Sequence, residues 1–580
     1  MDRLVSLLGV DSPPRYLIAL FTIPVLLFAL YHHLLPKPIP GIAYNPSAAK
    51  SLLGDVPDML AEVSQTGEFR VWCAKQVRKL NSPICQIFIK PFSQPWVLLS
   101  DFRESRDILT RRHREFDKSS FLSDGMACMG AFHGIYMTDH KFRANRQLIQ
   151  DLMTSTFLNG HVGPAVYSKG VELMRLFEMK GRLAGGRPFS VKKDFEYASL
   201  DCMLEFAFGR NWVDTAVGEQ LKVVGGLAEE GLVVPVSVDE PVEFPLGEIV
   251  DFLKSVYEAP EIVEKTINAI MPKLQTWWWS QQGWYKKIFE DKEKAMKAQV
   301  AIGIKNFQQG KIETGVEHML MREAARAEKE GREPDFESQV FRDELFGDIV
   351  GGHHTTSGAM MWLTKYLTDD PTIQSKLRSV LHSTLSAAHQ EGRLFTFEEI
   401  RHAKLPYLDA IIEEMLRINA VPVTREAVVD TTVLGCPIKK GTQVFFMSNG
   451  PGFLSPSFPV DETKRSDTSR LSKRANDSWD ESQDLARFDP ERWLVRKRDG
   501  TGVTADDVDF DGAAGPQLVF GLGPRTCWGR RLAHMEMKVI IAMLVWTFRL
   551  ERTPAELSGY GGLEGIARVP KKCYVRLVKL

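Results

Sequence analysis

Hydrophobic residues along this 580-residue chain recur mainly at helical spacing. Between Gln339 and Thr368 they return every three or four positions, as on one face of a long helix, and Pro371 lies just beyond its predicted end. Further helices are predicted over residues 407–418 and 530–546. Strand-like runs are short and occupy residues 84–89, 96–99, 443–447 and 573–578. The pattern therefore predicts a mostly α-helical fold with a minor β-sheet.

Residues 16–36 differ from the rest of the pattern. They contain no Asp, Glu, Lys or Arg and consist mostly of Leu, Ile, Phe, Ala and Val. About 20 helical residues cross a hydrocarbon layer of about 30 Å, so we predict an N-terminal membrane anchor over residues 1–36 with one transmembrane helix. A cleaved signal peptide is the alternative, but the bulky and proline-rich residues 32–41 do not suit a cleavage site. The flanking basic residues do not set an orientation.

Composition excludes several classes of protein. The 73 basic and 74 acidic residues give a net charge of −1, without the basic excess of a nucleic-acid-binding protein. The 7 cysteines are scattered and never form a CxxC pair, which indicates neither a disulfide framework nor a zinc site. A reducing compartment is the simpler interpretation. Residues 461–484 are dense in Ser, Asp, Arg and Lys and are predicted to be a flexible, charged insertion.

The strongest chemical signal is a cysteine in a glycine-rich loop directly before a predicted helix. Residues 520–529 read FGLGPRTCWG, and the helical pattern starts at Arg530. Unpaired N–H groups at a helix N-terminus favour a thiolate at Cys527, and Arg525 offers a bidentate donor to a carboxylate. The glycines allow a large, flat group to approach the backbone. A dinucleotide-binding loop is excluded because Thr526 holds the third glycine position of that motif, and a buried structural cysteine is the remaining alternative.

This loop resembles the haem-ligand signature FxxGxRxCxG of the cytochromes P-450. Its fixed positions are occupied by Phe520, Gly523, Arg525, Cys527 and Gly529. The resemblance implies that the chain binds haem b (heme b), with Cys527 as the axial thiolate ligand of the iron. It extends over nearly the whole chain after the anchor. Residues 37–580 are therefore expected to form one haem-thiolate catalytic domain with the cytochrome P-450 fold.

Three further residues match a structural signature of that family. Glu414 and Arg417 occupy its ExxR motif, and Arg492 lies in the segment between this motif and the cysteine. The resemblance implies a buried network of these three side chains that braces the core on the haem side. Its role is structural rather than catalytic.

Residues 351–356, GGHHTT, resemble the family's oxygen-activation motif (A/G)GxxTT. The resemblance implies that Thr355 lies over the iron and that its hydroxyl helps to deliver protons to bound dioxygen. His354 departs from the pattern, because the family usually has Asp or Glu there. A histidine titrates near neutrality, so His354 is a candidate catalytic proton relay. The alternative is that the usual relay is disabled.

Haem carries two propionate groups, which the family binds with basic side chains. The resemblance assigns this role to Arg525, to Arg146 as the arginine of the WxxxR helix, and to Arg425. Phe142 replaces the tryptophan of that helix, so one N–H donor to a propionate is lost. Surface salt bridges are the alternative for Arg146 and Arg425.

The general pattern resembles fungal microsomal members of the family. It implies a monooxygenase that inserts one oxygen atom from O2 into an apolar small organic substrate, such as a terpenoid, polyketide or alkaloid of secondary metabolism. The expected electron donor is an NADPH-dependent flavoprotein reductase, with Lys141, Arg143, Arg530 and Arg531 as candidate docking charges. The expected location is the endoplasmic reticulum membrane, with a single-pass anchor and the catalytic domain facing the cytosol. A haem-thiolate isomerase or dehydratase and a non-catalytic haem-binding sensor or carrier are the alternatives.

Overall fold

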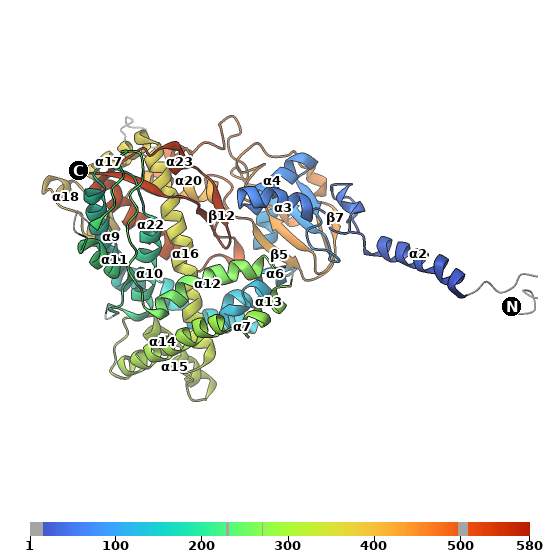
Figure 1. Cartoon of the computed structure of the whole chain (residues 1–580), viewed down its shortest axis with the longest axis horizontal. Coiled ribbons are helices and arrows are strands. Elements are labelled where there is room, and N and C mark those ends of the chain that lie inside the picture. Colours follow the sequence, from blue (N-terminus) through green and yellow to red (C-terminus); the bar gives the residue numbers. More distant parts are fainter. Residues whose placement is uncertain (1–14, 211, 228–230, 270, 497–507) are drawn as a thin grey trace, which may run out of the picture.

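Helix α16 (Gln339–Asp369), the longest of the described helices, passes through the middle of the helical part of the molecule (Figure 1). The computed structural model describes residues 15–210, 212–227, 231–269, 271–496 and 508–580, with side chains from residue 22 onward. Ser338 caps α16 by accepting a hydrogen bond from the amide of Phe341. Asp370 ends the helix and caps the next one, α17 (Pro371–Thr384), which starts with proline. The predicted long helix is confirmed.

Other helices pack around α16 and share one large hydrophobic core with it. Its direct neighbours include α10 (Lys192–Phe208), α12 (Asp251–Ile267), α20 (Pro406–Asn419) and α22 (Arg530–Thr547). The last two confirm the shorter helices expected from the sequence. The remaining helices are α3 (Val56–Thr66), α4 (Phe69–Leu80), α5 (Phe102–Thr110), α6 (Ser120–Gly125), α7 (His140–Leu148), α8 (Ser155–Phe157), α9 (Gly163–Ala184), α11 (Ala216–Gly225), α13 (Pro272–Trp279), α14 (Gly283–Gln308), α15 (Gly315–Glu330), α18 (Ser386–Gln390), α19 (Phe397–His402), α21 (Asp467–Leu471) and α23 (Ala555–Ser558).

A five-stranded sheet lies beside the helical part, in the order β1-β2-β8-β5-β3. Its strands are β1 (Ile84–Ile87), β2 (Trp96–Leu99), β3 (Phe116–Lys118), β5 (Val423–Ala427) and β8 (Gln443–Phe446). Every residue of β1, β2 and β8 is buried, so both faces of these three strands are covered by the rest of the molecule. The mostly helical fold with a minor β component is confirmed.

The other strands form small sheets. A three-stranded sheet joins β11 (Phe548–Glu551), β14 (Tyr574–Lys579) and β4 (Phe189–Ser190). Three two-stranded ribbons are β6 (Thr431–Val433) with β7 (Cys436–Ile438), β9 (Leu494–Arg496) with β10 (Val508–Phe510), and β12 (Gly562–Glu564) with β13 (Arg568–Pro570).

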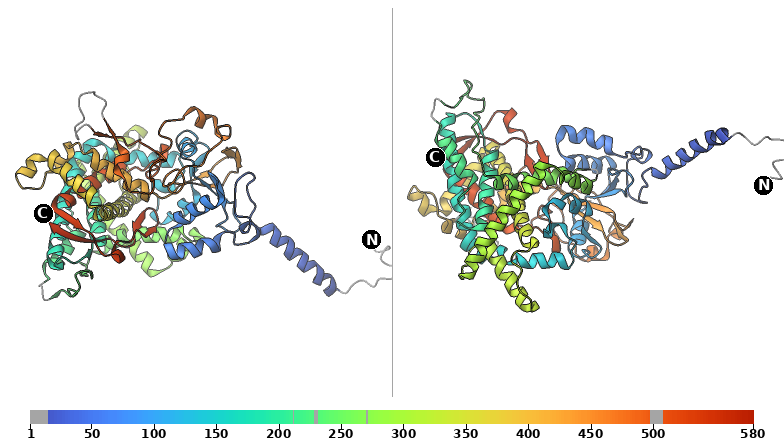
Figure 2. Two further views of the ribbon diagram at one scale, coloured as in Figure 1. Left: turned by 90° about the horizontal axis from the view of Figure 1, so that it is seen from above. Right: turned by 60° about the horizontal axis from the view of Figure 1, so that its bottom comes forward.

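Helix α2 (Arg15–Leu34) leads away from the body of the molecule (Figures 1 and 2). Its apolar side chains from Ile23 to Tyr31 are largely exposed. Within the described part of the chain, no helix is both long and apolar enough to cross a membrane. The transmembrane helix predicted within residues 1–36 is thus not supported by the described residues, and residues 1–14 of that range lie outside them.

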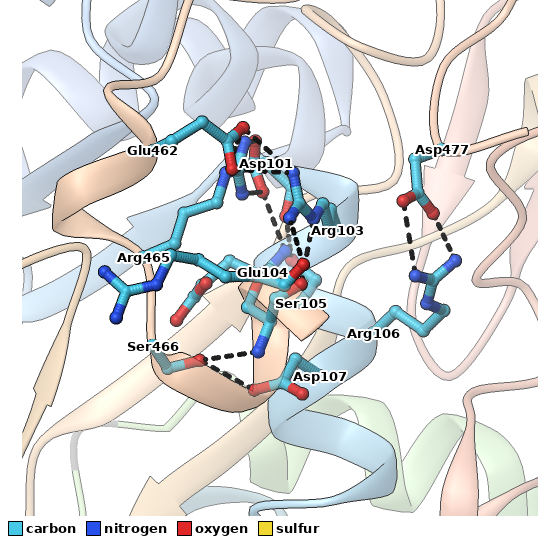
Figure 3. A network of polar contacts seen from close by, with 12 residues as sticks. Asp101, Arg103, Glu104, Ser105, Arg106, Asp107, Glu462, Arg465, Ser466 and Asp477 are labelled. Atoms are coloured by element: carbon cyan, nitrogen blue, oxygen red, sulfur yellow. Dashed lines mark hydrogen bonds and ion pairs between the residues drawn. The ribbon is translucent and has the colours of Figure 1, made fainter. Parts of the chain in front are cut away.

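The charged insertion, residues 461–484, is mostly exposed, but parts of it are fixed to the body of the molecule. It contains the short helices η7 (Glu462–Lys464) and α21, and it packs against α5 through paired charges (Figure 3). Arg465 binds the carboxylate of Asp101 with two hydrogen bonds of 2.6 and 2.8 Å. Arg103 of α5 binds Glu462 at 2.9 Å, and Arg106 forms an ion pair with Asp477. The charge run has complementary partners on a distant helix, which local composition does not reveal.

Candidate functional site

The loop before α22 presents Cys527. The backbone turns at Gly521 and Gly523 with φ of +64° and +72°, values that favour glycine. A Cβ on Gly523 would lie 2.0 Å from the carbonyl oxygen of Leu109, so the C-terminal end of α5 is packed directly against this loop. The amide of Cys527 donates to the carbonyl of Phe520 at 2.7 Å. The loop is therefore fixed by its neighbours and by its own backbone.

Cys527 is the only one of the seven cysteines whose side chain is exposed, and all seven lie within the described residues. Its exposed surface faces an internal cavity, which it lines. Cys436, by contrast, is buried in β7 with its Sγ 3.4 Å from the carbonyl oxygen of Gly41 and does not line the cavity. Of the seven cysteines, only Cys527 can offer its sulfur to a group bound there.

The same cavity collects most residues that the sequence singles out. Thr355, Gly351 and Gly352 line it from α16, together with Arg146 from α7 and Arg425 from β5. The cysteine loop adds Arg525 and Gly529. Phe520, Gly523 and His354 do not line it. Phe520 instead packs with its ring centroid 5.3 Å from that of His534, and Gly523 packs against α5.

A cluster of cations lines one part of the cavity. Lys118 on β3 and Arg425 on β5 are direct cross-strand partners, and like charges in that arrangement destabilise a sheet. Burial, followed by the charges of Arg525 and Arg425, lowers the pKa of Lys118 to about 7. Burial, with the charge of Arg525 next, lowers the pKa of Arg425 to about 10. Burial likewise lowers the pKa of Arg525 to about 10.

These cations lack enough acidic partners of their own. Nη1 of Arg525 is buried and has no hydrogen-bond partner among the described residues. Arg425 is 8% exposed, and the only hydrogen bond found for its side chain within the described residues goes to the carbonyl of Thr424 at 2.7 Å. A cavity with this surplus of positive charge fits an anionic ligand. Two carboxylates of a haem would meet these groups while its iron met Cys527.

The aromatic residues near the cluster keep the guanidinium groups in place. The guanidinium carbon of Arg525 lies 4.2 Å from the ring centroid of Phe142, and that of Arg146 lies 4.1 Å from the ring centroid of Trp528. Stacking of arginine on an aromatic face is favourable. Phe142 is buried, so it retains the packing role of the tryptophan that it replaces, without an N–H donor.

The protonation of Cys527 differs from the sequence prediction. Burial raises the pKa of the Cys527 thiol, although the Gly529 amide and the charges of Arg146 and Arg530 lower it. The helix N-terminus therefore does not create a thiolate by itself. A bound metal ion deprotonates a coordinating thiol, and this thiol fits that case.

His354 lies on a different side of α16 from Thr355. Its Nε2 is 3.3 Å from Oε1 of Glu264 on α12, and Thr355 donates its hydroxyl proton to the carbonyl of Gly351 at 2.8 Å. Thr355 lines the cavity, whereas His354 does not. The prediction that His354 relays protons beside Thr355 is therefore not supported.

Glu414, Arg417 and Arg492 form the buried network that the sequence predicts. Both oxygens of Glu414 accept hydrogen bonds from Arg417, at 2.7 and 2.8 Å, and Oε1 also accepts one from Arg492 at 3.0 Å. Trp493 donates its indole N–H to Oε2 at 2.9 Å. Arg417 donates further to the carbonyls of Phe453 and Leu485, at 2.6 and 2.8 Å.

Sequence reasoning missed four residues of the site: Lys118, His133, Glu344 and Asp348. Lys118, His133 and Asp348 line the cavity. Glu344 does not line it but is hydrogen-bonded to His133. Lys118 stands in a run of mixed charges and carries no local signal. Asp348 could have been found, because it precedes Thr355 by seven residues and thus shares its helix face.

Comparison with known proteins agrees with this geometry. A family model described as Cytochrome P450 matches residues 74–450 and 479–575. The chain is 36% identical to cytochrome P450 monooxygenase TRI13 of Fusarium sporotrichioides, over 96% of this chain and 97% of that protein. It is also 36% identical to cytochrome P450 monooxygenase xilC of Penicillium rubens, over 95% and 94%. A shorter match, 39% identical over 46% of this chain and 86% of the relative, is the Hps1-dma1 cluster cytochrome P450 monooxygenase cyp3.1 of Dothistroma septosporum. The chain therefore belongs to the cytochrome P450 family of monooxygenases, which bind haem through a cysteine thiolate.

Proposed function

We propose that this protein inserts one atom of O2 into an apolar small organic substrate, with Cys527 as the iron ligand and electrons from an NADPH-dependent flavoprotein reductase. The observation that carries the proposal is the single cavity that Cys527, the cation cluster and Thr355 share. The haem supplies the oxidising chemistry when bound, and a thiolate ligand favours cleavage of the O–O bond.

The residues of the chain have separate tasks in this proposal. Arg425, Arg525 and Arg146, joined by Lys118, bind the propionates, whose negative charges offset the positive surplus of the cluster. Gly351 leaves part of one face of α16 without a side chain, so that a flat group fits beside it. Thr355 holds a hydroxyl proton at the cavity.

The cavity walls support an apolar substrate. Phe132, Met153, Met203, Phe206 and Leu532 line it beside the site of the iron ligand. Such walls bind through burial of apolar surface and place few hydrogen-bonding demands on a ligand. We propose a terpenoid, polyketide or alkaloid of secondary metabolism, and one relative is named after a gene cluster.

The reductase is proposed to dock beside the cysteine loop. Lys141, Arg143 and Arg531 are exposed there, and the side chain of Arg530 is 50% exposed. A positive surface suits an acidic partner and speeds its association at low ionic strength. The docking rate is therefore expected to fall as salt rises.

We propose that the N-terminal segment holds the enzyme at the endoplasmic reticulum membrane, with the catalytic domain facing the cytosol. The exposed apolar side chains of residues 23–31 support membrane attachment. Alkaline carbonate extraction of membranes tests it, with a chain lacking residues 1–36 as the comparison. Release of the full chain into the soluble fraction would contradict the proposal.

The first experiment is the carbon monoxide difference spectrum of the reduced protein beside a Cys527→Ala variant. A Soret band typical of thiolate-bound haem is expected in the wild type and not in the variant. If haem-loaded wild-type protein lacks this band, or Cys527→Ala retains it, the ligand assignment is wrong.

A haem-thiolate isomerase or dehydratase is the second candidate, because the usual acidic position is occupied by His354, which pairs with Glu264. Oxidation of NADPH by the purified protein with a reductase separates the two. A monooxygenase consumes NADPH and O2, whereas an isomerase, a dehydratase or a haem-binding sensor consumes neither.

A further inference from the structure

The cavity contains an acid that the family pattern does not predict. Asp348 lies on α16 seven residues before Thr355, and both residues line the cavity. Seven residues are almost two helical turns, so the two side chains share one face and lie about 10 Å apart along the axis. A monooxygenase consumes protons at this face, and its usual acid is missing at position 354.

The helix surface between Asp348 and Thr355 is bare. Gly351 lies one turn from each of them, and a Cβ built on it would meet no described atom within 4 Å. Gly352 beside it is tightly packed, because a Cβ there would lie 2.4 Å from the sulfur of Met203. The open space therefore lies at Gly351, on the helix face between Asp348 and Thr355.

Two other titratable groups stand next to Asp348. One polar atom each of His133, Glu344 and Asp348 lies within 4.8 Å of the others. Nδ1 of His133 is 2.8 Å from Oε2 of Glu344, so one proton lies between these atoms whichever of them carries it. Glu344 also accepts hydrogen bonds from the backbone amide of His133 and, at 2.6 Å, from Asn145.

Of these three residues, Asp348 has a side-chain oxygen that is free to form a further hydrogen bond. Its Oδ2 is buried and has no hydrogen-bond partner among the described residues, whereas both oxygens of Glu344 are engaged. A carboxyl oxygen in this position can hold a proton for the cavity and release it there.

In the haem-free protein, burial and the charges around Asp348 place its pKa near neutral pH. Burial, followed by the charge of Glu344, raises the pKa of Asp348 to about 7, and the charges of His133 and Arg146 oppose the rise. Burial raises the pKa of Glu344 to about 8, against Asn145, the His133 amide and Arg146. Burial lowers the pKa of His133 to about 4, with Arg146, Arg525 and Lys118 acting in the same direction. A general acid works best when its pKa lies near the working pH.

We propose that Asp348 is the acid that supplies protons to the cavity beside Thr355, in place of the acid missing at position 354, and that Glu344 and His133 resupply it. For each proton delivered, the O–H bond of Asp348 breaks and a new one forms with a proton from Glu344, passed through a water across the gap of at most 4.8 Å. Glu344 regains its proton from Nδ1 of His133, and His133 takes one from solvent at Nε2. The electrons come from NADPH through the reductase, so this proposal rests on the monooxygenase function proposed above.

Infrared spectroscopy of the haem-loaded protein tests the acid directly. Between pH 5 and 9 we expect the difference spectrum of wild type minus Asp348→Asn to show one carboxylic acid C=O band that titrates near pH 7. Glu344→Gln removes the titratable neighbour whose charge raises the pKa of Asp348, so the midpoint of this band is expected to shift to lower pH. If Asp348→Asn retains the full band, Asp348 is not protonated near neutral pH and the proposal is wrong.

NADPH-driven turnover with a reductase provides the second readout. In Asp348→Asn, we expect NADPH oxidation to fall by roughly 100-fold, as for loss of a general acid, and more of the consumed O2 to leave as hydrogen peroxide. Asp214→Asn, an exposed loop variant, is the matched control, and haem content confirms folding. If His354→Gln causes this loss and Asp348→Asn does not, the relay runs through His354 and the proposal is overturned. A wild-type protein that binds haem but oxidises no NADPH contradicts the proposed function, while the infrared band still decides whether Asp348 is the acid.

Discussion

The Glu414 network and the cation cluster of the cavity both bury charged groups, but only the first is complete. Glu414 accepts from Arg417, Arg492 and Trp493, and Arg417 uses its remaining donors on carbonyl groups. In the cavity, Lys118 and Arg425 face each other across two strands, and Arg525 keeps an unpaired donor among the described residues. A buried network that satisfies itself has a structural role, whereas one with surplus charge marks the place of a ligand.

The largest expected effect is the loss of the network's only acid. Glu414→Gln leaves Arg417 and Arg492 buried without a counter-charge, which costs about 3–5 kcal/mol. This is a large part of a typical domain stability of about 5–15 kcal/mol. We expect a steep drop in the yield of haem-loaded protein and in the midpoint of chemical denaturation. Glu398→Gln, which removes an exposed partner of Arg401, is the control and is expected to change neither.

The second prediction is that removing a charged group from the cavity does not destabilise the haem-free protein, in contrast to Glu414→Gln. Arg425→Gln removes one cation from a repulsive cluster, so the haem-free protein is expected to be as stable as the wild type or more stable. Haem affinity is expected to fall by about 1.5–3 kcal/mol, the contribution of a hydrogen bond to a charged group. Haem transfer to apomyoglobin and denaturation of the haem-free protein measure the two quantities. A haem-free variant as unstable as Glu414→Gln would show that Arg425 is structural.

The smallest expected effect is a pH dependence from Lys118. Because its pKa falls to about 7 in the folded, haem-free protein, the unfolded chain binds more protons above that pH. The free energy of unfolding therefore rises with pH, by roughly 1–2 kcal/mol between pH 7 and 9. Lys118→Met is expected to flatten this dependence. Denaturation of the haem-free wild type and variant at both pH values checks it, and equal slopes would contradict the assignment.

The sequence predicts the parts of this molecule that are encoded locally. The long helix α16, the cysteine loop and the Glu414 network are recognisable because periodicity, glycine spacing and a short motif define them. Lys118 joins the site only through the pairing of β3 with β5, and His133 only because its loop folds onto α16. No local pattern carries such long-range contacts. The motif gives the position of His354 in the sequence but not its contact with Glu264 on α12, which lies away from the cavity.

The insertion on α5 has a consequence for the design of chimeric enzymes. The family match leaves out residues 451–478, a stretch that includes the partners of Arg103 and Arg106, and α5 also abuts the cysteine loop at Gly523. A graft that replaces this stretch with a shorter connection from another family member would leave the buried Arg103 and Arg106 without their acidic partners. Such a graft needs compensating changes at both arginines, so the insertion and α5 are expected to be inherited as one unit.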